Sequence, residues 1–349
     1  MLRRNSKRVK VGNIYIGGDS PVTVQSMLNK PASDIEGSVS QAVALEKAGC
    51  EIIRAAVPDM AAVKLIEKLK ENLTVPVVAD IHFDYRLALA SLDAGVDKIR
   101  INPGNIGSMD RVKAVADACK AKNVPIRIGV NSGSLEKELL AKYGSPCAQA
   151  LAESALGHVS LLEQCDFDDI VISIKSSSVP TMIESYRLVA EKCDYPLHLG
   201  VTEAGTHDMA LIKSSVGIGS LLLDGIGDTI RVSMTDDPVN EVSAAVGILK
   251  SCGIRKGGVD IVACPTCGRT KIDLIGLAKE VESRLSACKK NIKVAVMGCA
   301  VNGPGEAREA DIGIAGGDGC ALIFKKGEIV CKVPENEAVN TLISEIEKL

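Results

Sequence analysis

Three cysteines near the C-terminal end of this 349-residue chain have the spacing of ligands to a metal centre. Two residues separate Cys264 from Cys267, and Cys299 lies in a glycine-rich segment at residues 297–306. Three thiolates are one fewer than the set that usually holds a [4Fe–4S] cluster, which leaves one iron open to a weaker ligand or to a substrate. Glu306, in the same segment, is the nearest candidate for that fourth ligand. The pattern predicts a cluster that takes part in chemistry as well as in electron transfer.

A structural zinc site is the alternative for the same cysteines. Such a site normally needs four closely spaced Cys or His ligands. The sequence has no second CxxC pair, and none of its four histidines lies in this region. Residue types alone therefore favour the iron–sulfur cluster over zinc.

A second group of polar residues lies in apolar, β-branched runs, and most of its members are at or just beyond the carboxyl ends of these runs. The group comprises Arg54, Asp80, His82, Arg100, Asn102, Arg127, Asn131, Ser173, Lys175, His198, Thr202, Glu203, Arg231 and Ser233. Five of its members are strand cations, which would be costly to bring together without anions. Because the planar guanidinium group of arginine suits phosphate oxygens, we expect a small substrate that carries phosphates, and a diphosphate in particular.

Individual members of this group also have simpler roles open to them. Any single arginine could pair with a neighbouring carboxylate, and only the repetition on five strands favours a polyanion site. Asp80 and His82 could form an acid–base pair or could serve as partners for the arginines, and the sequence leaves both roles open. His158 and His207 are expected to be helix or loop residues without partners.

The elements that must position these residues alternate between short β-branched runs and helical stretches. The strands are expected at residues 22–27, 51–57, 75–81, 98–102, 125–130, 169–175, 196–202 and 229–234. This repeat predicts an α/β fold, a TIM (β/α)8 barrel, in which catalytic residues lie at the carboxyl ends of the strands. A doubly wound sheet is the second choice. The long interval after the fifth strand, at residues 131–146, predicts an active-site loop.

The chain is expected to divide into two domains, with residues 1–254 as the substrate-binding barrel and residues 255–349 as a small α+β domain that binds the cluster. A closing helix is predicted at residues 240–251 and a glycine-rich linker at 253–258. The second domain is expected to contain strands at 259–263, 293–297 and 312–315, a helix at 271–289, a hairpin within 321–333 and a last helix at 335–349.

Composition excludes several classes of function. Aromatic residues make up only 2% of the chain, which argues against stacking platforms for nucleic-acid bases. A net charge of −3 provides no general attraction to nucleic acid or to membranes. The twelve cysteines are mostly scattered singly, as in a reduced protein. No apolar run is long enough to span a membrane and no secretory signal is evident, so we expect a cytoplasmic protein.

Motifs spread in order over nearly the whole chain resemble the bacterial 4-hydroxy-3-methylbut-2-enyl diphosphate synthase family of the methylerythritol phosphate route to isoprenoids. The motifs lie at residues 22–27, 54–58, 79–83, 98–105, 127–131, 200–205, 225–231, 264–269 and 302–306. The resemblance is to the two-domain bacterial form, without the inserted domain of the plant type.

The resemblance implies an oxidoreductase that opens 2-C-methyl-D-erythritol 2,4-cyclodiphosphate, removes a hydroxyl group as water and adds two electrons from flavodoxin or ferredoxin. It implies that a [4Fe–4S] cluster is held by Cys264, Cys267, Cys299 and Glu306. It implies that the diphosphate is bound by Arg54, Arg100, Arg127, Asn131, Lys175, Arg231 and Ser233. It places Asp80, His82, Glu203, Asn302 and Glu306 near the reacting carbons or the cluster, with Glu203 as a candidate for acid–base or hydroxyl-positioning work.

Two other functions suit the same residues. An iron–sulfur hydro-lyase acting on a phosphorylated small molecule would use an open iron without net redox change. A zinc-stabilised protein that binds a phosphorylated ligand would be no enzyme at all. A requirement for an external reductant would distinguish the reductive reaction from the hydro-lyase. Iron with labile sulfide in the purified protein would exclude the zinc-stabilised binding protein.

The linker predicts that the working site is shared by two chains. The closing helix should run back to the face of the barrel opposite the cations. Residues 253–259 can then span at most about 25 Å, barely enough to bring the cluster domain around to its own barrel mouth. We therefore expect a homodimer in which each cluster domain serves the partner's barrel.

Overall fold

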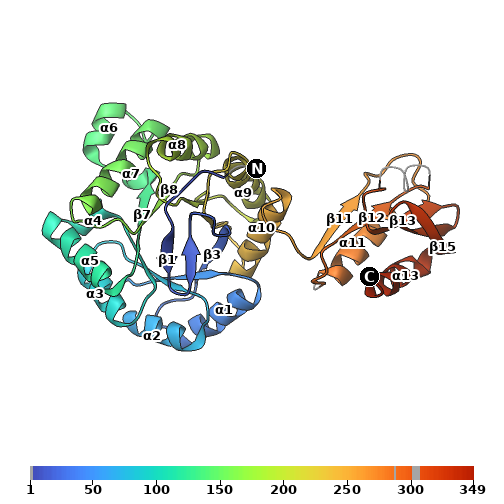
Figure 1. The fold of residues 1–349 in the computed structure, drawn as a ribbon, viewed down its shortest axis with the longest axis horizontal. Coiled ribbons are helices and arrows are strands. Elements are labelled where there is room, and N and C mark those ends of the chain that lie inside the picture. The colour runs from blue at the N-terminus through green and yellow to red at the C-terminus, as the bar shows by residue number, and fades with distance from the viewer. Residues whose placement is uncertain (1–2, 287, 301–306) are drawn as a thin grey trace. The chain divides into compact units, whose positions relative to one another are not determined.

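The computed structural model describes residues 3–286, 288–300 and 307–349. The chain forms two compact units, Met1–Ile254 and Arg255–Leu349 (Figure 1). No helix among the described residues is long and apolar enough to cross a membrane.

In the described part of the first unit, parallel strands form one eight-stranded sheet in the order β8-β7-β6-β5-β4-β3-β10-β9. They are β3 (Thr23–Met27), β4 (Ile52–Ala56), β5 (Val77–Asp80), β6 (Lys98–Ile101), β7 (Ile126–Asn131), β8 (Ile170–Lys175), β9 (His198–Leu199) and β10 (Thr229–Ile230). The two ends of the sheet meet because Ile172 bridges to Leu197 in parallel. The predicted TIM barrel is confirmed.

Strands β9 and β10 are only two residues long, far shorter than the sequence predicts. The chain continues in the strand direction, as the bond from Arg231 N–H to the Leu199 carbonyl at 2.9 Å shows. A Cβ atom at Gly200 would lie 2.7 Å from the Arg231 carbonyl oxygen, so the two segments approach too closely there for a side chain. This irregular packing interrupts the ladder near the carboxyl ends of both strands.

Helices surround the barrel as an outer ring (Figure 1). They are α1 (Ile35–Lys47), α2 (Val63–Asn72), α3 (Tyr85–Asp93), α4 (Pro103–Ile106), α5 (Met109–Lys122), α6 (Lys137–Tyr143), α7 (Ala148–Glu163), α8 (Val179–Lys192), α9 (His207–Leu223) and α10 (Pro238–Ser251). Asp34, Asp84 and Ser178 cap the N-termini of α1, α3 and α8 with side-chain hydrogen bonds, as these residue types favour. The main core lies between the helices and the strands, where Leu45, Ile66 and many other apolar side chains are buried.

A hairpin that no sequence pattern predicts closes the N-terminal end of the barrel. Strands β1 (Val9–Val11) and β2 (Ile14–Ile16) pair antiparallel and lie over the barrel centre in the view of Figure 1. Their Val11 and Ile16 side chains pack on Ile52 and Val78 at the start of β4 and near the start of β5. Strands of three residues carry too little periodic pattern to be recognised from sequence.

The long interval after β7 forms a short 3₁₀ helix, η1 (Ser132–Ser134), followed by α6, and this segment is fixed to α7. His158 on α7 is buried, and its Nε2 lies 2.7 Å from Glu136 Oε1. Burial would raise the pKa of the Glu136 carboxyl, but His158 and Ser154 help to hold it at about 2. The expectation that His158 and His207 lack partners is wrong, since His207 Nδ1 also contacts Asp208 Oδ1 at 2.9 Å.

The second unit is a five-stranded sheet with helices packed on it. Its elements are β11 (Val259–Ala263), α11 (Leu274–Leu285), β12 (Ile292–Met297), β13 (Ile312–Gly317), β14 (Cys320–Lys325), β15 (Glu328–Pro334), η2 (Glu335–Glu337) and α13 (Ala338–Glu347). Strands β11, β12 and β13 are parallel, and β14 and β15 follow antiparallel. Val281 of α11 and Leu342 of α13 are buried in one core with the sheet. The expected α+β character is confirmed.

Candidate active site

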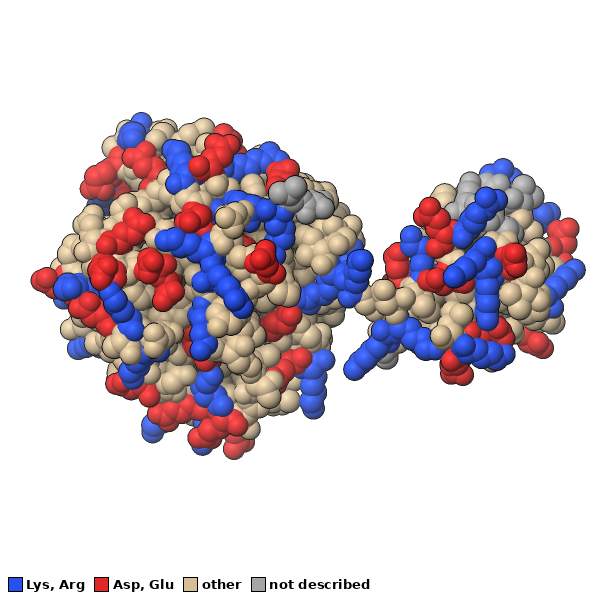
Figure 2. All heavy atoms as spheres, in the orientation of Figure 1, with Lys and Arg blue, Asp and Glu red and all other residues tan. Residues whose placement is uncertain are grey.

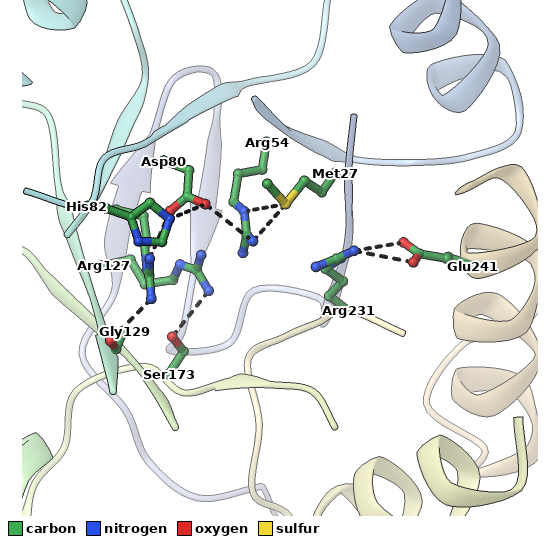
Figure 3. Close-up of polar contacts among 10 residues, drawn as sticks. Met27, Arg54, Asp80, His82, Arg127, Gly129, Ser173, Arg231 and Glu241 are labelled. Carbon is green, nitrogen blue, oxygen red and sulfur yellow. Dashed lines mark hydrogen bonds and ion pairs between the residues drawn. The ribbon is translucent and has the colours of Figure 1, made fainter. Parts of the chain in front are cut away.

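The barrel interior contains three buried arginines, which come from β4, β6 and β7. Arg54 on β4, Arg100 on β6 and Arg127 on β7 are at most 3% exposed. Figure 3 shows Arg54 and Arg127 directed towards the same region of the barrel interior. The Cα atoms of Arg100 and Arg127 are register partners, so both side chains start at the same level of the barrel. The structure thus brings together residues that lie far apart in the sequence.

Asp80 is the carboxylate between these arginines. Arg100 Nη1 donates to its Oδ1 at 3.0 Å, and Arg54 Nη2 lies 3.5 Å from its Oδ2. His82 reaches the same Oδ2 from the rim, with its Nε2 at 3.6 Å (Figure 3). Burial would raise the pKa of the Asp80 carboxyl, but Arg54, His82 and Arg100 hold it well below its usual range. Asp80 is therefore ionised and acts as a partner for the arginines.

One carboxylate does not satisfy three guanidinium groups. Arg127 Nη1 donates to Ser173 Oγ at 3.2 Å, but its Nε and Nη2 have no partner among the described residues. Within the described part of the chain, Arg54 donates hydrogen bonds only to the sulfur of Met27 and forms an ion pair with Asp80, and its Nη1 has no partner. Buried donors without acceptors are costly, so they indicate a missing anion.

Lys175, at the end of β8 next to β7, and Arg231, just after β10, complete the group. Burial, followed by Arg54, Arg100 and Arg127, lowers the pKa of Lys175 well below its usual range. Arg231 Nη2 contacts Glu241 on α10 at 3.3 Å (Figure 3). The Lys175 amine and the three buried arginines repel one another, and an anion bound among them would relieve that repulsion.

Little free space remains inside this group. A cavity of about 10 Å³ is lined by Arg54, Ser173, Lys175, Tyr186, His198, Gly200, Val201, Thr202, Arg231 and Ser233. That volume holds about one water molecule, so a diphosphate must bind against the open side of the cluster or displace side chains. A larger hollow of about 500 Å³ beside the N-terminal hairpin is lined by Arg8, Tyr15, Glu51 and neighbours, and by none of these cations.

The remaining predicted barrel residues lie on the rim. Asn131 ends β7 beside Lys175, to which it is paired in register. Ser233 borders the cavity described above. Glu203 is exposed and has a backbone φ of 52°, an unusual conformation for a residue with a side chain. Such strain is often retained where function requires a side chain to point in one direction.

The cysteine loops lie at the carboxyl ends of β11 and β12. The Gly298 N–H donates to Cys264 Sγ at 3.1 Å, which brings the Cys264 loop next to the residue preceding Cys299. Lys271 N–H also bonds to the Gly298 carbonyl at 2.9 Å. The Arg269 backbone N–H and side chain lower the pKa of the exposed Cys267 thiol, favouring the thiolate that metals bind.

The described residues contain no group of three metal-ligating side chains that already converge on one point. Glu306 and Asn302 lie outside the described residues, so their predicted roles stay predictions. The donor set itself fits an iron–sulfur cluster. The two loops that carry the three thiols are hydrogen-bonded to each other, and the lowered pKa of the Cys267 thiol favours its thiolate form.

Comparison with known proteins assigns the chain to a family. Residues 6–246 match the GcpE TIM-barrel domain, and residues 260–348 match the GcpE protein C-terminal domain. The chain belongs to the GcpE family. Relatives from Clostridium perfringens and Clostridium acetobutylicum are 62% and 60% identical over the full length of both chains. Both relatives are named 4-hydroxy-3-methylbut-2-en-1-yl diphosphate synthase (flavodoxin).

Solved structures outside the GcpE family show the same barrel. Dihydropteroate synthase from Stenotrophomonas maltophilia aligns with a TM-score of 0.53 at 15% identity, covering 70% of this chain and 97% of that one. The enzyme from Xanthomonas albilineans gives a TM-score of 0.51 at 15% identity, covering 71% and 98%. At this identity the likeness shows the fold alone.

Two buried groups of this GcpE-family barrel, Glu241 and Lys98, were not selected by sequence reasoning, and a third, His198, was selected only as a polar strand residue. Glu241 holds Arg231, and Lys98 and His198 lie inside the barrel with the arginines. His198 appeared among the polar strand residues, but no pattern distinguished its role. Lys98 precedes Arg100 by two residues, so strict alternation along β6 would have placed it in the interior.

Proposed function

We propose that this GcpE-family chain converts 2-C-methyl-D-erythritol 2,4-cyclodiphosphate to (E)-4-hydroxy-3-methylbut-2-enyl diphosphate by a two-electron reduction. The observation that carries the proposal is the set of buried guanidinium donors in the barrel that have no acceptor among the described residues. The names of the full-length relatives support the same reaction.

The cations bind the diphosphate in this proposal. Arg54, Arg100 and Arg127 offer donors from β4, β6 and β7. Lys175 and Arg231 offer donors from β8 and from the segment after β10. Asn131 and Ser233 add neutral hydrogen bonds at the rim. Asp80 holds Arg54 and Arg100 in place, which preorganises them before the substrate arrives.

The cysteines hold the redox group. Cys264, Cys267 and Cys299 would bind a [4Fe–4S] cluster, with Glu306 as an exchangeable fourth ligand. When bound, such a cluster supplies the two electrons one at a time and an iron with an open position.

Residues on the rim of the barrel would donate or carry the protons that the reaction needs. His82 is about half exposed and contacts the ionised Asp80, so it can carry a proton close to the reacting carbons. Glu203 can position the substrate hydroxyl or protonate it as it leaves. Asn302, beside the cysteine loops in sequence, is the further candidate for contact with the reacting atoms.

Flavodoxin is the proposed electron donor, because the relatives' names specify it, and ferredoxin is the second candidate. Figure 2 shows acidic and basic side chains interspersed on the visible face of the barrel unit, with no broad basic area there. Arg54, Arg100 and Arg127 are buried inside the barrel, where their positive charge suits a small substrate.

We also propose that the protein is a homodimer with a shared active site. Helix α9 carries an exposed apolar stripe formed by Met209, Ile212, Val216 and Leu223, each between 50% and 56% exposed. Apolar side chains at this helical spacing commonly mark a protein interface. The seven-residue connection that follows α10 gives independent support, because it leaves little chain for a cluster domain to reach its own barrel mouth.

An anaerobic assay tests the proposed reaction. The reconstituted protein should convert the cyclodiphosphate to the linear allylic diphosphate when dithionite is present and should not convert it when the reductant is omitted. Turnover without reductant would favour the hydro-lyase, and zinc in place of iron with labile sulfide would favour a binding protein. Failure to act on the cyclodiphosphate under reducing conditions would contradict the proposal.

A further inference from the structure

Lys98 is a buried amine beneath the arginine cluster. It lies on β6 two residues before Arg100, so its side chain enters the barrel one layer closer to the N-terminal end. It is fully buried, and its Nζ has no hydrogen-bond partner among the described residues. Its register partner Val78 packs with Val11 and Ile16 of the N-terminal hairpin, which seals this end of the barrel from water.

The groups that face this amine are positively charged or neutral. Burial first, and then the charges of Arg127 on β7 and Arg54 on β4, lower the pKa of the Lys98 amine well below its usual range. Burial and the same cations also lower the pKa of His198 on β9, and Lys98 in turn helps to lower it, so the imidazole stays neutral.

The neighbouring carboxylate does not neutralise the amine. Asp97 adjoins Lys98 in sequence and is the one carboxylate found to raise its pKa among the described residues. The Asp97 side chain is committed elsewhere, because its Oδ2 accepts from Lys70 Nζ at 2.6 Å and from the Val77 N–H at 2.8 Å. An ammonium at this position would therefore be a buried charge without a partner, which is strongly unfavourable.

The proposed reaction changes the charge above this amine. A cyclic diphosphate carries one negative charge on each phosphorus. Ring opening creates a terminal phosphate, which loses its second proton at roughly pH 6 and so adds a third charge near neutral pH. The balance is substrate dianion plus two electrons plus one proton giving product trianion plus water. The barrel must accommodate one more negative charge after the reaction than before it.

We propose that Lys98 is a charge reserve, uncharged in the free barrel and protonated when a linear diphosphate occupies the arginine cluster. The proton comes from solvent through the ligand-bound mouth and is returned when the product leaves. Lys98 touches no substrate atom and acts through the field at the cluster, so it is a positioning residue. The inference rests on the proposed function, because it needs a diphosphate at the arginines.

Calorimetry of ligand binding tests this inference. The oxidised, cluster-loaded full-length protein is titrated anaerobically with the linear allylic diphosphate at one pH in buffers of different ionisation enthalpy, which yields the number of protons taken up. The wild type should take up protons, and Lys98→Met should take up about one fewer. The matched control is Lys64→Met on the exposed face of α2, which should equal the wild type.

Further measurements separate the effect of the Lys98 charge on ligand binding from any effect of the substitution on folding. The affinity of the wild type should weaken as pH rises more steeply than that of Lys98→Met, because proton uptake on binding is opposed at high pH. Urea unfolding should show that Lys98→Met is at least as stable as the wild type, because the substitution removes a buried amine. Lys98→Leu provides a second variant of similar volume. The cyclic diphosphate should give a smaller difference between wild type and variant.

The outcomes distinguish the inference from the function on which it rests. Equal proton numbers for the wild type and Lys98→Met, with both proteins binding the linear diphosphate, would overturn the charge reserve alone. No binding of either diphosphate by the folded wild type would overturn the proposed function, and the charge reserve with it.

Discussion

The hydroxyl group of Tyr186 donates a hydrogen bond to the backbone carbonyl of His198. The same hydroxyl accepts from the Ile174 N–H at 2.9 Å. Two residues earlier, the Ile172 N–H bonds directly to the Pro196 carbonyl at 2.9 Å, as in an ordinary parallel ladder. Tyr186 of α8 therefore inserts its hydroxyl between β8 and β9, at the seam that closes the barrel. This insertion separates the two strands beside the cavity that Ser173 and Lys175 border.

Tyr186→Phe should destabilise the barrel. The substitution leaves a buried N–H and a buried carbonyl without their partner, and each unsatisfied group costs about 1–3 kcal/mol. Urea unfolding should show this loss, and affinity for the diphosphate should fall because the seam borders the site. Tyr143→Phe, which removes a peripheral bond to Glu153, is the control and should change stability by less than about 1 kcal/mol. Equal stability of Tyr186→Phe and wild type would show that the seam closes without the hydroxyl.

Arg127→Met should weaken diphosphate binding. A hydrogen bond to a charged group contributes roughly 1.5–3 kcal/mol, so the dissociation constant should rise by about one to two orders of magnitude. Stability should not fall in parallel, because Arg127 has only one protein partner, Ser173, and two unpartnered donors among the described residues. Arg86→Met, at an exposed pair with Asp84, is the matched control. Unchanged affinity in Arg127→Met would remove this arginine from the binding site.

Replacing any of Cys264, Cys267 and Cys299 by Ala should abolish the visible absorption of the reconstituted cluster, since the remaining two thiolates cannot hold it. Glu306→Ala should reduce turnover more than iron content, because a single carboxylate oxygen is a weak ligand. Iron and sulfide analysis with optical spectra provides the measurement. Cys147→Ala in the barrel should leave the spectrum intact. Full activity of Glu306→Ala would exclude this carboxylate as ligand or proton donor.

Glu203→Gly should separate the effect of backbone strain on stability from the effect of the carboxylate on turnover. Relief of the left-handed backbone at φ 52° should raise the free energy of unfolding by up to about 1 kcal/mol, while loss of the carboxylate should reduce turnover. Lys326→Gly, at φ 47° in the β14–β15 turn, should bring a similar gain in stability with normal turnover. Normal turnover of Glu203→Gln would leave only a positioning role for this residue.

Mixed dimers test the shared site. A Cys264→Ala chain and an Arg127→Met chain should each be nearly inactive alone, yet their heterodimer should regain part of the activity because one cluster domain and one barrel remain intact. Met209→Glu on the α9 stripe should weaken dimerisation, measured by sedimentation. Verified heterodimers without any recovery would mean that each cluster serves its own barrel.

Local patterns in the sequence predicted the alternating strands and helices of the barrel and selected the candidate site residues, whose roles stay predictions. Alternating β-branched runs and amphipathic helices predicted the barrel, because each βα unit is encoded within a short stretch of chain. The repetition of Arg54, Arg100 and Arg127 within such runs predicted that their side chains would meet, since parallel strands in a barrel run in one direction around a common interior. Cysteine spacing likewise indicated a metal centre without any knowledge of the fold.

Only the tertiary structure decided which of these groups lack partners. Asp80 meets two arginines, Glu241 reaches Arg231 from the closing helix, and Lys98 remains unpaired beneath them among the described residues. Tyr186 enters a strand ladder from a helix that follows β8. These relationships join residues that are at least ten positions apart, and no local period in the sequence records them. Their energies depend on burial and on the distance between charges, which exist only once the barrel has closed.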